Sequence, residues 1–544
     1  MTDTSKSFDY IIVGAGSAGC VLAERLSSVS ENRVLLIEAG GEDKSPFISM
    51  PLGIGKTLFN PDLCWYYPTE PEPGNAGQPR IFMRGKVLGG SSSVNGMIYC
   101  RGQPEDYNDW EAQGCVGWNW HTMRDAFRAI EDHELGDDGN RGVGGPLHIS
   151  IRADRTPLSE AILNAAEALG TPRRDDINQP QQEGIGYSAV TMRKGRRISS
   201  ADAFLRPARW RPNLAVVTNT SVEQLLIEGG RVVGVSGRGP HGPVRYRAGQ
   251  ETILSCGAIE SPKLLMNSGI GPSEHLQELG INVVVDLPGV GRNLREHKTL
   301  GFQYRLKKRD YSINHQVRGW RVPINLLRYK LRSDGPLAST YDLTAFIKTR
   351  PGIAQPDAQL LFWNLTINKD NPSEVESHPG LLAMGYPLRT SSEGSVRLRS
   401  ADPADKPIIK TNFLDTEYDQ SVMLGIFHYV RRLFDQKKLA SFVDLETYPG
   451  ESVFDDNSIL DAARRDVTCQ HAVGTCRMGN GKLSVLDSSL RVRGVQGLRV
   501  VDLAALPSQV SGNTNGPVMA FAWRASELIL RENKSSSKRG GEGR

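Results

Sequence analysis

The chain has little net charge, no long apolar run and no paired cysteines. A formal charge of +4 over 544 residues is too small to indicate nucleic-acid binding. No stretch is apolar for long enough to span a bilayer, and the first ten residues lack the basic and then apolar pattern of a signal peptide. These absences predict a cytoplasmic protein without a nucleic-acid partner.

The seven cysteines are scattered, odd in number and free of any CxxC pair. This spacing argues against a disulfide framework and against a zinc site, and it suits a reducing compartment. We therefore expect no metal in the functional site. The composition is otherwise that of an ordinary soluble protein, with 39% hydrophobic and 23% charged residues. Because the chain is too long for one compact core, we expect two domains, or one domain with a large insertion.

A glycine-rich turn near the start of the chain is the most informative motif. Residues 10–13 have the apolar character of a buried strand, residues 14–19 are GAGSAG, and a helical pattern follows. Gly14, Gly16 and Gly19, with Ser17 among them, would let the backbone approach a pyrophosphate at the helix N-terminus. Glu38 ends a second apolar segment 19 residues after Gly19, close to the roughly 20 expected for an acid that binds ribose.

The alternative is a βαβ unit that binds no nucleotide. We favour the dinucleotide site because the strand, the helix and the acid all accompany the glycines. The acid also disfavours a nucleotide with a 2′-phosphate, which it would repel.

Strand-and-helix units recur late in the chain, while the middle has an alternating β pattern. Strand-like residues 251–255 and 498–502 each precede a helix, and residues 214–235 contain a predicted hairpin. We therefore predict an α/β plus α+β protein. Its Rossmann-like FAD-binding domain would be built from the discontinuous segments 1–155, 215–305 and 466–533, and its substrate-binding domain, a mostly antiparallel sheet with helices, from 156–214 and 306–465. The polar tail 534–544 is predicted to be disordered.

One segment complicates the cytoplasmic expectation. Residues 317–332 mix arginines with Trp, Ile and Leu, a composition that also occurs in helices lying on membranes. We favour a solvated basic helix that packs by its apolar side, because Pro323 interrupts the amphipathic pattern. Peripheral association with the inner face of a membrane stays open.

His471 differs from the other nine histidines because small residues surround it. About 40 residues later, Asn513 and Asn515 lie in a turn that opens a predicted helix. A neutral imidazole that accepts a hydroxyl proton, with an amide that binds the oxygen, is what alcohol oxidation requires. On composition alone, a lone histidine is more often structural.

Six motifs occur in the order of a known family. The chain resembles the glucose-methanol-choline (GMC) oxidoreductases, and within them the choline dehydrogenase-like and aliphatic alcohol dehydrogenase branch. The matching segments are GAGSAG at 14–19, RGKVLGGSSSVNGMIYCRG at 84–102, GAIESPKLLMNSGIGP at 257–272, DLPGVGRNL at 286–294, HAVGTCRMG at 471–479 and GNTNGP at 512–517.

The resemblance implies FAD, with its ADP half on the Gly14, Gly16, Gly19 and Glu38 unit. It also assigns Val222 to the adenine side and Asp502 to the ribityl or pyrophosphate part. Val87, Asn95, Gly96 and Met97 would line the flavin, and Asn515 would contact the flavin or pack the turn. Relatives with covalent flavin carry histidine where Val94 stands, so FAD should be noncovalent. Trp523 replaces an acid that is common in this branch.

The resemblance further implies oxidation of a primary alcohol to the aldehyde. His471 would accept the hydroxyl proton, Asn513 would bind the oxygen, and hydride would pass to flavin N5. Electrons would then reach a quinone or another acceptor. The alternatives are an oxidase that forms hydrogen peroxide, a hydroxynitrile lyase, a light-driven decarboxylase, and a nicotinamide enzyme that uses only the first motif.

The sequence encodes the substrate weakly. Tyr341, Phe346 and Trp363 are candidate pocket walls, or they pack a sheet. Such aromatics could also cage a quaternary ammonium. Since no decisive acidic partner for a cation is evident, a neutral aliphatic or aryl alcohol is the expected substrate.

Overall fold

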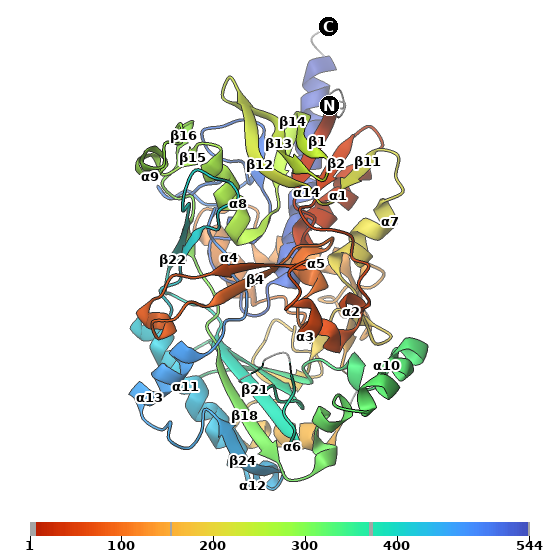
Figure 1. Ribbon diagram of the computed structural model, residues 1–544, viewed down its shortest axis with the longest axis vertical. Coiled ribbons are helices and arrows are strands. Elements are labelled where there is room, and N and C mark those ends of the chain that lie inside the picture. Colours follow the sequence, from red (N-terminus) through yellow and green to blue (C-terminus); the bar gives the residue numbers. More distant parts are fainter. Residues whose placement is uncertain (1–6, 153–154, 369–370, 372–373, 542–544) are drawn as a thin grey trace.

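The computed structural model describes residues 7–152, 155–368, 371 and 374–541. Two sheets lie at opposite ends of its long axis, and the chain passes between them several times (Figure 1). The N-terminal sheet is drawn at the top and the second sheet at the bottom. The predicted mixed architecture, with one α/β part and one largely antiparallel part, is confirmed.

The upper sheet is the Rossmann-like part. Its order is β11-β2-β1-β14-β13-β12, and β25 also pairs with β14. Its strands are β1 (Ser7–Val13), β2 (Val34–Ile37), β11 (Leu214–Val217), β12 (Ser221–Glu228), β13 (Arg231–Gly239), β14 (Gly242–Leu254) and β25 (Leu498–Val500). Strands β11, β2, β1, β14 and β25 run parallel, while β12 and β13 form the predicted antiparallel hairpin. Segments from three distant parts of the chain thus form one sheet.

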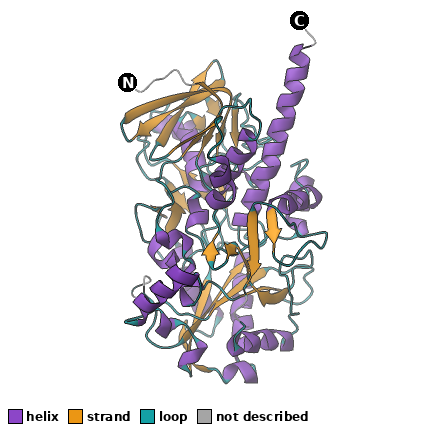
Figure 2. Ribbon diagram, turned by 90° about the vertical axis from the view of Figure 1, so that its right-hand side faces the viewer, coloured by secondary structure: helices purple, strands orange, loops and turns teal. Residues whose placement is uncertain are grey.

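Helices follow these strands at the edge that faces the middle of the molecule. They are α1 (Ser17–Ser27), α8 (Gly257–Asn267) and α14 (Asn515–Gly541). Figure 2 shows α14 as the long helix that ends at the C-terminus. Trp523 on α14 lies under the guanidinium of Arg25 on α1, at 4.1 Å from the ring centroid. Trp523 therefore joins two helices of this domain.

The lower sheet has the order β24-β18-β21-β20-β19-β7, and all of its pairings are antiparallel. Its strands are β7 (Gly184–Tyr187), β18 (Leu300–Leu306), β19 (Leu343–Ile347), β20 (Ala358–Trp363), β21 (Gly380–Pro387) and β24 (Val443–Tyr448). Helices α6 (Pro157–Ala168), α11 (Glu417–Phe434) and α13 (Asp456–Arg465) share its hydrophobic core.

Shorter elements connect the two parts. The short strands are β3 (Cys64–Pro68), β4 (Ile81–Gly85), β5 (Glu131–His133), β6 (Leu147–Ile151), β8 (Ala189–Val190), β9 (Met192–Arg193), β10 (Arg196–Arg197), β15 (Ile270–Gly271), β16 (Val285–Asp286), β17 (Arg292–Leu294), β22 (Gly394–Arg397) and β23 (Ile408–Lys410). The other α-helices are α2 (Pro46–Ser49), α3 (Ile54–Thr57), α4 (Pro104–Ala112), α5 (Trp120–Ile130), α7 (Arg206–Ala208), α9 (Ser273–Glu278), α10 (Arg321–Arg332) and α12 (Lys437–Ala440).

Two predicted domain boundaries differ from the structure. Strand β18 crosses the boundary at 305/306 and belongs to the lower sheet, so the upper segment ends before Leu300. Strands β22 and β23 were expected in the substrate domain, yet β22 pairs with β17, and Val396 and Ile409 share a hydrophobic cluster with the apolar residues of β1 and β2. An alternating strand pattern gives no information about which of two cores receives its apolar face.

Two predictions about exposed segments also differ. Helix α14 continues to Gly541, so the backbone of 534–541 is helical rather than disordered, because no proline or glycine occurs between Pro517 in its first turn and Gly540. Residues 542–544 lie outside the described residues. Residues 321–332 do form a helix, α10, but four of its large apolar side chains are exposed rather than packed.

Candidate active site

A cavity of about 2090 Å³ lies where the two parts meet. Its walls come from the β1–α1 turn, the end of β2 and the start of α8 in the upper part, and from β20 and β21 in the lower part. Ordinary ligand pockets are roughly 300–1,000 Å³. The space is therefore large enough for a dinucleotide and a second, smaller molecule.

The glycine turn is shaped for a ligand at the upper end of the cavity. Gly14 has φ +99°, and a Cβ there would lie 2.5 Å from the carbonyl oxygen of Ser255. A Cβ at Gly19 would lie 1.9 Å from the oxygen of Gly14. At Gly16, which lines the cavity, the nearest protein atom would be 3.9 Å away. Gly14 and Gly19 thus permit the tight turn, and Gly16 leaves the space beside the α1 N-terminus open.

Glu38 lines the same end of the cavity. Its Oε2 accepts a hydrogen bond from the Ala15 amide at 2.8 Å, and its Oε1 accepts one from the Gly40 amide at 2.9 Å. Burial nevertheless raises the pKa of its carboxyl to about 7. Further donors, such as the hydroxyls of a ribose, would favour the ionised form.

Ser17, Asn515, Val222 and Asp502 also line the cavity. Ser17 Oγ donates to Asn515 Oδ1 at 2.7 Å, which ties the glycine turn to the start of α14. The Asp502 carboxylate already accepts from Gly257 N at 2.8 Å, from Ser261 Oγ at 2.6 Å and from Ala504 N at 2.7 Å. Asp502 therefore holds the start of α8 against the cavity.

The segment predicted to line the flavin divides into two groups. Asn95, Gly96 and Met97 line the cavity, as does Val94. A Cβ at Gly96 would lie 3.2 Å from the ring of Tyr341, so glycine lets this loop approach the lower part closely. Val87 does not line the cavity.

Val87 instead packs in a small cluster with Ile48 and Leu63 and is fully buried. The side chain of Val87 thus packs in this cluster and does not face the cavity. Its neighbours in the motif face the cavity because the chain turns sharply at Gly89 and Gly90, which both have positive φ.

His471 and Asn513 lie together at the cavity, although 42 residues separate them. His471 Nε2 is 3.3 Å from Asn513 Nδ2. Burial, followed by the neighbouring His297 and Arg84, lowers the pKa of His471 well below its ordinary value. The imidazole is therefore neutral at physiological pH.

The buried His297 determines which nitrogen of His471 carries the proton. His297 Nε2 lies 2.9 Å from the carbonyl oxygen of Leu388, which can only accept, so this nitrogen is the donor. Burial lowers the pKa of His297 to about 4, so its Nδ1 has no proton. His471 Nδ1, at 2.9 Å, must then donate to it. This leaves His471 Nε2 as a free base directed at Asn513.

Asn513 is oriented in a similar way. Its Oδ1 accepts from Gln359 Nε2 at 3.0 Å, and the Tyr386 hydroxyl donates to Gln359 Oε1 at 2.7 Å. Because the oxygen of Asn513 is held on this side, its NH₂ group points toward His471. The site thus presents a base and a hydrogen-bond donor side by side.

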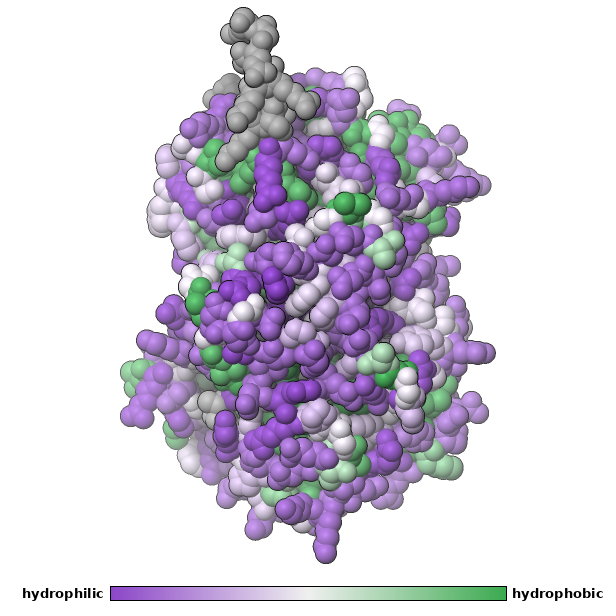
Figure 3. Space-filling model, turned by 180° about the vertical axis from the view of Figure 1, so that it is seen from behind, coloured by the Kyte–Doolittle hydropathy of each residue, from purple (hydrophilic) through white to green (hydrophobic). Residues whose placement is uncertain are grey.

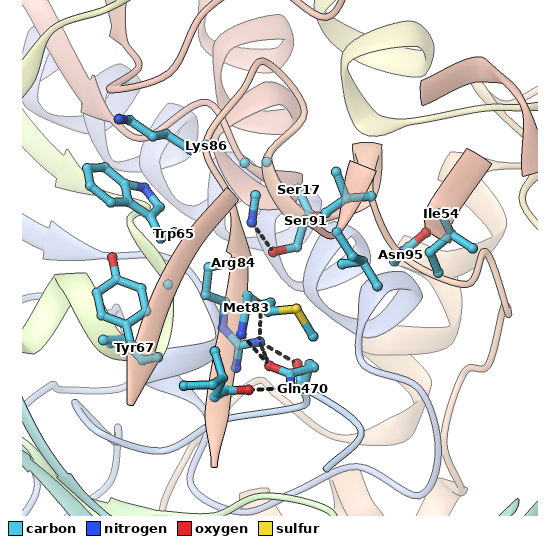
Figure 4. A pocket seen from close by; sticks show the side chains of 18 of the residues that line it. Ser17, Ile54, Trp65, Tyr67, Met83, Arg84, Lys86, Ser91, Asn95 and Gln470 are labelled. Carbon is cyan, nitrogen blue, oxygen red and sulfur yellow. Dashed lines mark hydrogen bonds between the residues drawn. The ribbon is translucent and has the colours of Figure 1, made fainter. Parts of the chain in front are cut away.

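Hydrogen bonds from neighbouring side chains hold the backbone at His471. Glu296 Oε1 accepts from the amides of His471 at 2.7 Å and His297 at 2.9 Å. Arg84 Nη1 donates to the carbonyl oxygen of Gln470 at 2.9 Å, and Figure 4 shows the two side chains joined on the cavity wall. Gln470 itself has a positive φ of 67°. These bonds fix the position of the imidazole relative to the cavity.

Sequence reasoning missed His297, Gln359 and Tyr386. The motif at 286–294 stops three residues before His297, and the closeness of a histidine to this motif is the one signal that could have drawn attention to it. Gln359 and Tyr386 lie in β20 and β21, whose pattern indicates only strands.

The lower wall is apolar and aromatic. Tyr341, Leu361, Trp363 and Met384 line it, and the rings of Tyr341 and Trp363 are 5.1 Å apart. Phe346 is fully buried in the core and does not line the cavity. Two of the three aromatic residues expected at the pocket are therefore there.

Comparisons with known proteins agree along the whole chain. One family model described as GMC oxidoreductase matches residues 8–299, and a second matches residues 390–522. The chain is 38% identical to an oxygen-dependent choline dehydrogenase from Rhizobium etli, over 96% of this chain and 95% of the relative. It is also 38% identical to an alcohol dehydrogenase [acceptor] from Pseudomonas putida, over 96% of each. A solved formate oxidase of Aspergillus oryzae, studied for the effect of a mutation on its FAD modification, has a TM-score of 0.89, with 28% identity over 98% of this chain and 100% of that chain.

Proposed function

Because this chain belongs to the GMC oxidoreductase family, we propose that it oxidises a neutral aliphatic or aryl primary alcohol to the aldehyde and passes the electrons to a quinone or another acceptor. Its cofactor is FAD. The relatives that it matches include choline and alcohol dehydrogenases, so a substrate with a CH–OH group is common to them. The class of alcohol and the electron acceptor of this chain are what we propose.

One observation carries the proposal: a neutral imidazole nitrogen without a proton faces an amide NH₂ at 3.3 Å on the wall of a large cavity. An alcohol hydroxyl placed between them would donate to His471 Nε2 and accept from Asn513 Nδ2. The pair thus matches a hydroxyl group, which is a donor and an acceptor at once.

The residues present fit FAD. The glycine turn, with Gly16 beside the α1 N-terminus, would receive the pyrophosphate, and Glu38 would bind the ribose. Asn95, Gly96 and Met97 would lie against the flavin. Val94 offers no side-chain nucleophile for a covalent link, so the flavin is held noncovalently. When bound, FAD supplies the acceptor for the hydride of the alcohol.

Side chains of this protein accept and hold the hydroxyl proton of the alcohol. His471 Nε2 takes the hydroxyl proton and becomes an imidazolium whose Nδ1–H stays bonded to His297. Asn513 steadies the oxygen while its negative charge develops. Because the pKa of the buried His471 is low, its imidazolium form readily releases the proton once the aldehyde leaves.

The walls from the lower domain favour an uncharged alcohol. Leu361, Trp363 and Met384 are uncharged, and a cation would lose its hydration there without gaining an opposite charge from them. Two features favour a quaternary ammonium such as choline: the ring faces of the Tyr341–Trp363 pair, and the side chain of the acidic residue Glu374, which also lines the cavity. Choline is therefore the competing substrate.

An anaerobic screen of alcohols tests the proposal. We expect an uncharged primary alcohol to bleach the flavin absorbance of the purified protein, with choline slower. Faster bleaching by choline would overturn the substrate class, and no bleaching by any alcohol would favour the non-redox lyase. Hydrogen peroxide equal to the aldehyde formed in air would favour the oxidase over the dehydrogenase. Acid precipitation should release yellow flavin into the supernatant.

A further inference from the structure

Helix α10 presents a stripe of large apolar side chains to solvent. Trp320, Ile324, Leu327 and Leu331 are 71%, 55%, 59% and 73% exposed. Their spacing of four, three and four residues places them on one face of the helix. Scattered exposed apolar residues are normal, but four in line on one helix are not.

The opposite face of α10 is the one that packs. Tyr329 is buried, and its hydroxyl donates to the carbonyl oxygens of Ser49 at 3.0 Å and Gly195 at 3.1 Å. Val322 is half-buried and lines the cavity, and Leu326 lines it too while staying 38% exposed. The helix is therefore anchored with its apolar stripe turned away from the protein.

Basic side chains flank this stripe. The segment 317–332 contains Arg318, Arg321, Arg328, Lys330 and Arg332 and no acidic residue. On the helix, residues 321 and 328 lie to one side of the stripe and residue 330 to the other. The nearest acid along the chain, Asp334, pairs with Arg328 at 2.6 Å. Long basic side chains beside an apolar face suit the boundary between lipid tails and anionic headgroups.

The stripe lies near exposed residues of the cavity wall. Phe47 in α2 and Phe59 after α3 line the cavity and are 39% and 47% exposed. The α2 segment and α10 are joined through Met50, which packs with Tyr329. In Figure 1, α10 projects from the right edge beside α2 and α3. Seen from behind, most of the surface is hydrophilic, with small apolar patches that include one at the left edge, where α10 projects (Figure 3).

We propose that the outward face of α10 seats the protein on an anionic lipid surface, with the exposed cavity wall at Phe47 and Phe59 next to the bilayer. Basic side chains alone would suit contact with water, and an apolar stripe alone would suit a protein core. The two together on one exposed helix favour an anionic lipid surface. The part of the chain that the structure describes contains no helix that could span a bilayer. If the proposed oxidation holds, an apolar alcohol could enter directly from the bilayer.

Vesicle sedimentation of the full flavin-loaded protein tests this proposal. We expect pelleting with vesicles that contain phosphatidylglycerol, little pelleting with pure phosphatidylcholine, and release in 0.5 M salt. Lys330→Glu with Arg332→Glu should lower the binding constant by about tenfold or more. Trp320→Ala with Leu331→Ala should lower it by a similar factor.

Matched variants elsewhere control for general effects. Lys437→Glu with Lys438→Glu reverses two exposed charges on α12, and Trp210→Ala with Phe454→Ala removes two apolar side chains that are 86% and 70% exposed. Both pairs should bind vesicles like the unaltered protein.

Three results would overturn the proposal. The first is that the protein does not pellet with anionic vesicles. The second is that the α10 variants and their control variants lose vesicle affinity equally. The third is that the protein does not bind vesicles but forms a dimer that the α10 substitutions abolish. The last result would assign the stripe to a second copy of the chain. None of these measurements requires alcohol turnover, so failure here leaves the proposed oxidation standing.

Discussion

His297 and His471 face each other through their Nδ1 atoms at 2.9 Å, and only His471 can supply the shared proton. The reason lies on the far side of His297, where Nε2 is committed to the carbonyl oxygen of Leu388. A main-chain carbonyl in the lower domain thus determines, through two rings, which nitrogen of His471 is free for chemistry. This makes His297 a positioning residue whose effect can be measured.

Removal of the base should slow the reaction but spare the cofactor. We expect His471→Ala to lower the rate of flavin reduction by about 100-fold or more, as when a general base is lost. Stopped-flow absorbance without oxygen measures this rate, and the flavin content per protein serves as the control. A native rate in this variant would show that His471 is not the base.

Replacement of His297 should act through the proton position on His471. His297→Asn can accept from His471 Nδ1 and donate to Leu388, so we expect it to keep most of the activity. His297→Leu can do neither, and we expect a loss of about tenfold to 100-fold. The pH dependence of kcat/KM separates this effect from misfolding: loss of His297, which lowers the pKa of His471, should move the acidic limb to higher pH. Equal activity and identical profiles in the two variants would contradict the assignment.

Acid should destabilise the protein in part through His297. Burial lowers its pKa from 6.5 to about 4, so the unfolded chain binds a proton over a range in which the folded chain does not. This contribution to stability is fully present above pH 6.5 and is lost as the pH falls toward 4, with a maximum of about 3 kcal/mol. Thermal melting should therefore show a smaller drop in Tm between pH 6.5 and 4.5 for His297→Asn. Parallel curves for the two proteins would rule this out.

The orientation of Asn513 should depend on Gln359. Gln359→Glu replaces an NH₂ donor with a carboxylate oxygen, which would attract the NH₂ group of Asn513 and turn its oxygen toward His471. We expect the rate of flavin reduction to fall by about tenfold to 100-fold. Gln359→Met, which is similar in size and without charge, should lower the rate of flavin reduction by a smaller factor. If the Glu variant retained the native rate, the amide would not be the donor to the alcohol.

Two glycines of the same turn should respond differently to alanine. Gly14→Ala combines a positive φ with a Cβ 2.5 Å from Ser255 O, so we expect a lower Tm or failure to fold. Gly16→Ala finds no protein atom within 3.9 Å, so we expect a folded protein that binds FAD weakly. Tm and the ratio of flavin to protein absorbance measure both effects. Full flavin content in a folded Gly16→Ala protein would place the pyrophosphate elsewhere.

The sequence predicted the parts of the site that form locally. The glycine turn, the acid at the end of β2 and the order of strands and helices each depend on residues near one another in the chain, and periodicity and turn chemistry report such neighbours. The family motifs added His471 and Asn513. The exposure of α10 was mispredicted, because an amphipathic pattern does not say whether anything covers its apolar face.

What the tertiary structure alone decided is the protonation and orientation of the proposed catalytic groups, His471 and Asn513. The proton on His471 depends on His297, 174 residues away, and the direction of the Asn513 amide depends on Gln359, 154 residues away. Hydrogen bonds act over about 3 Å. No local pattern can therefore encode them, and they exist only once the fold brings these distant side chains into contact.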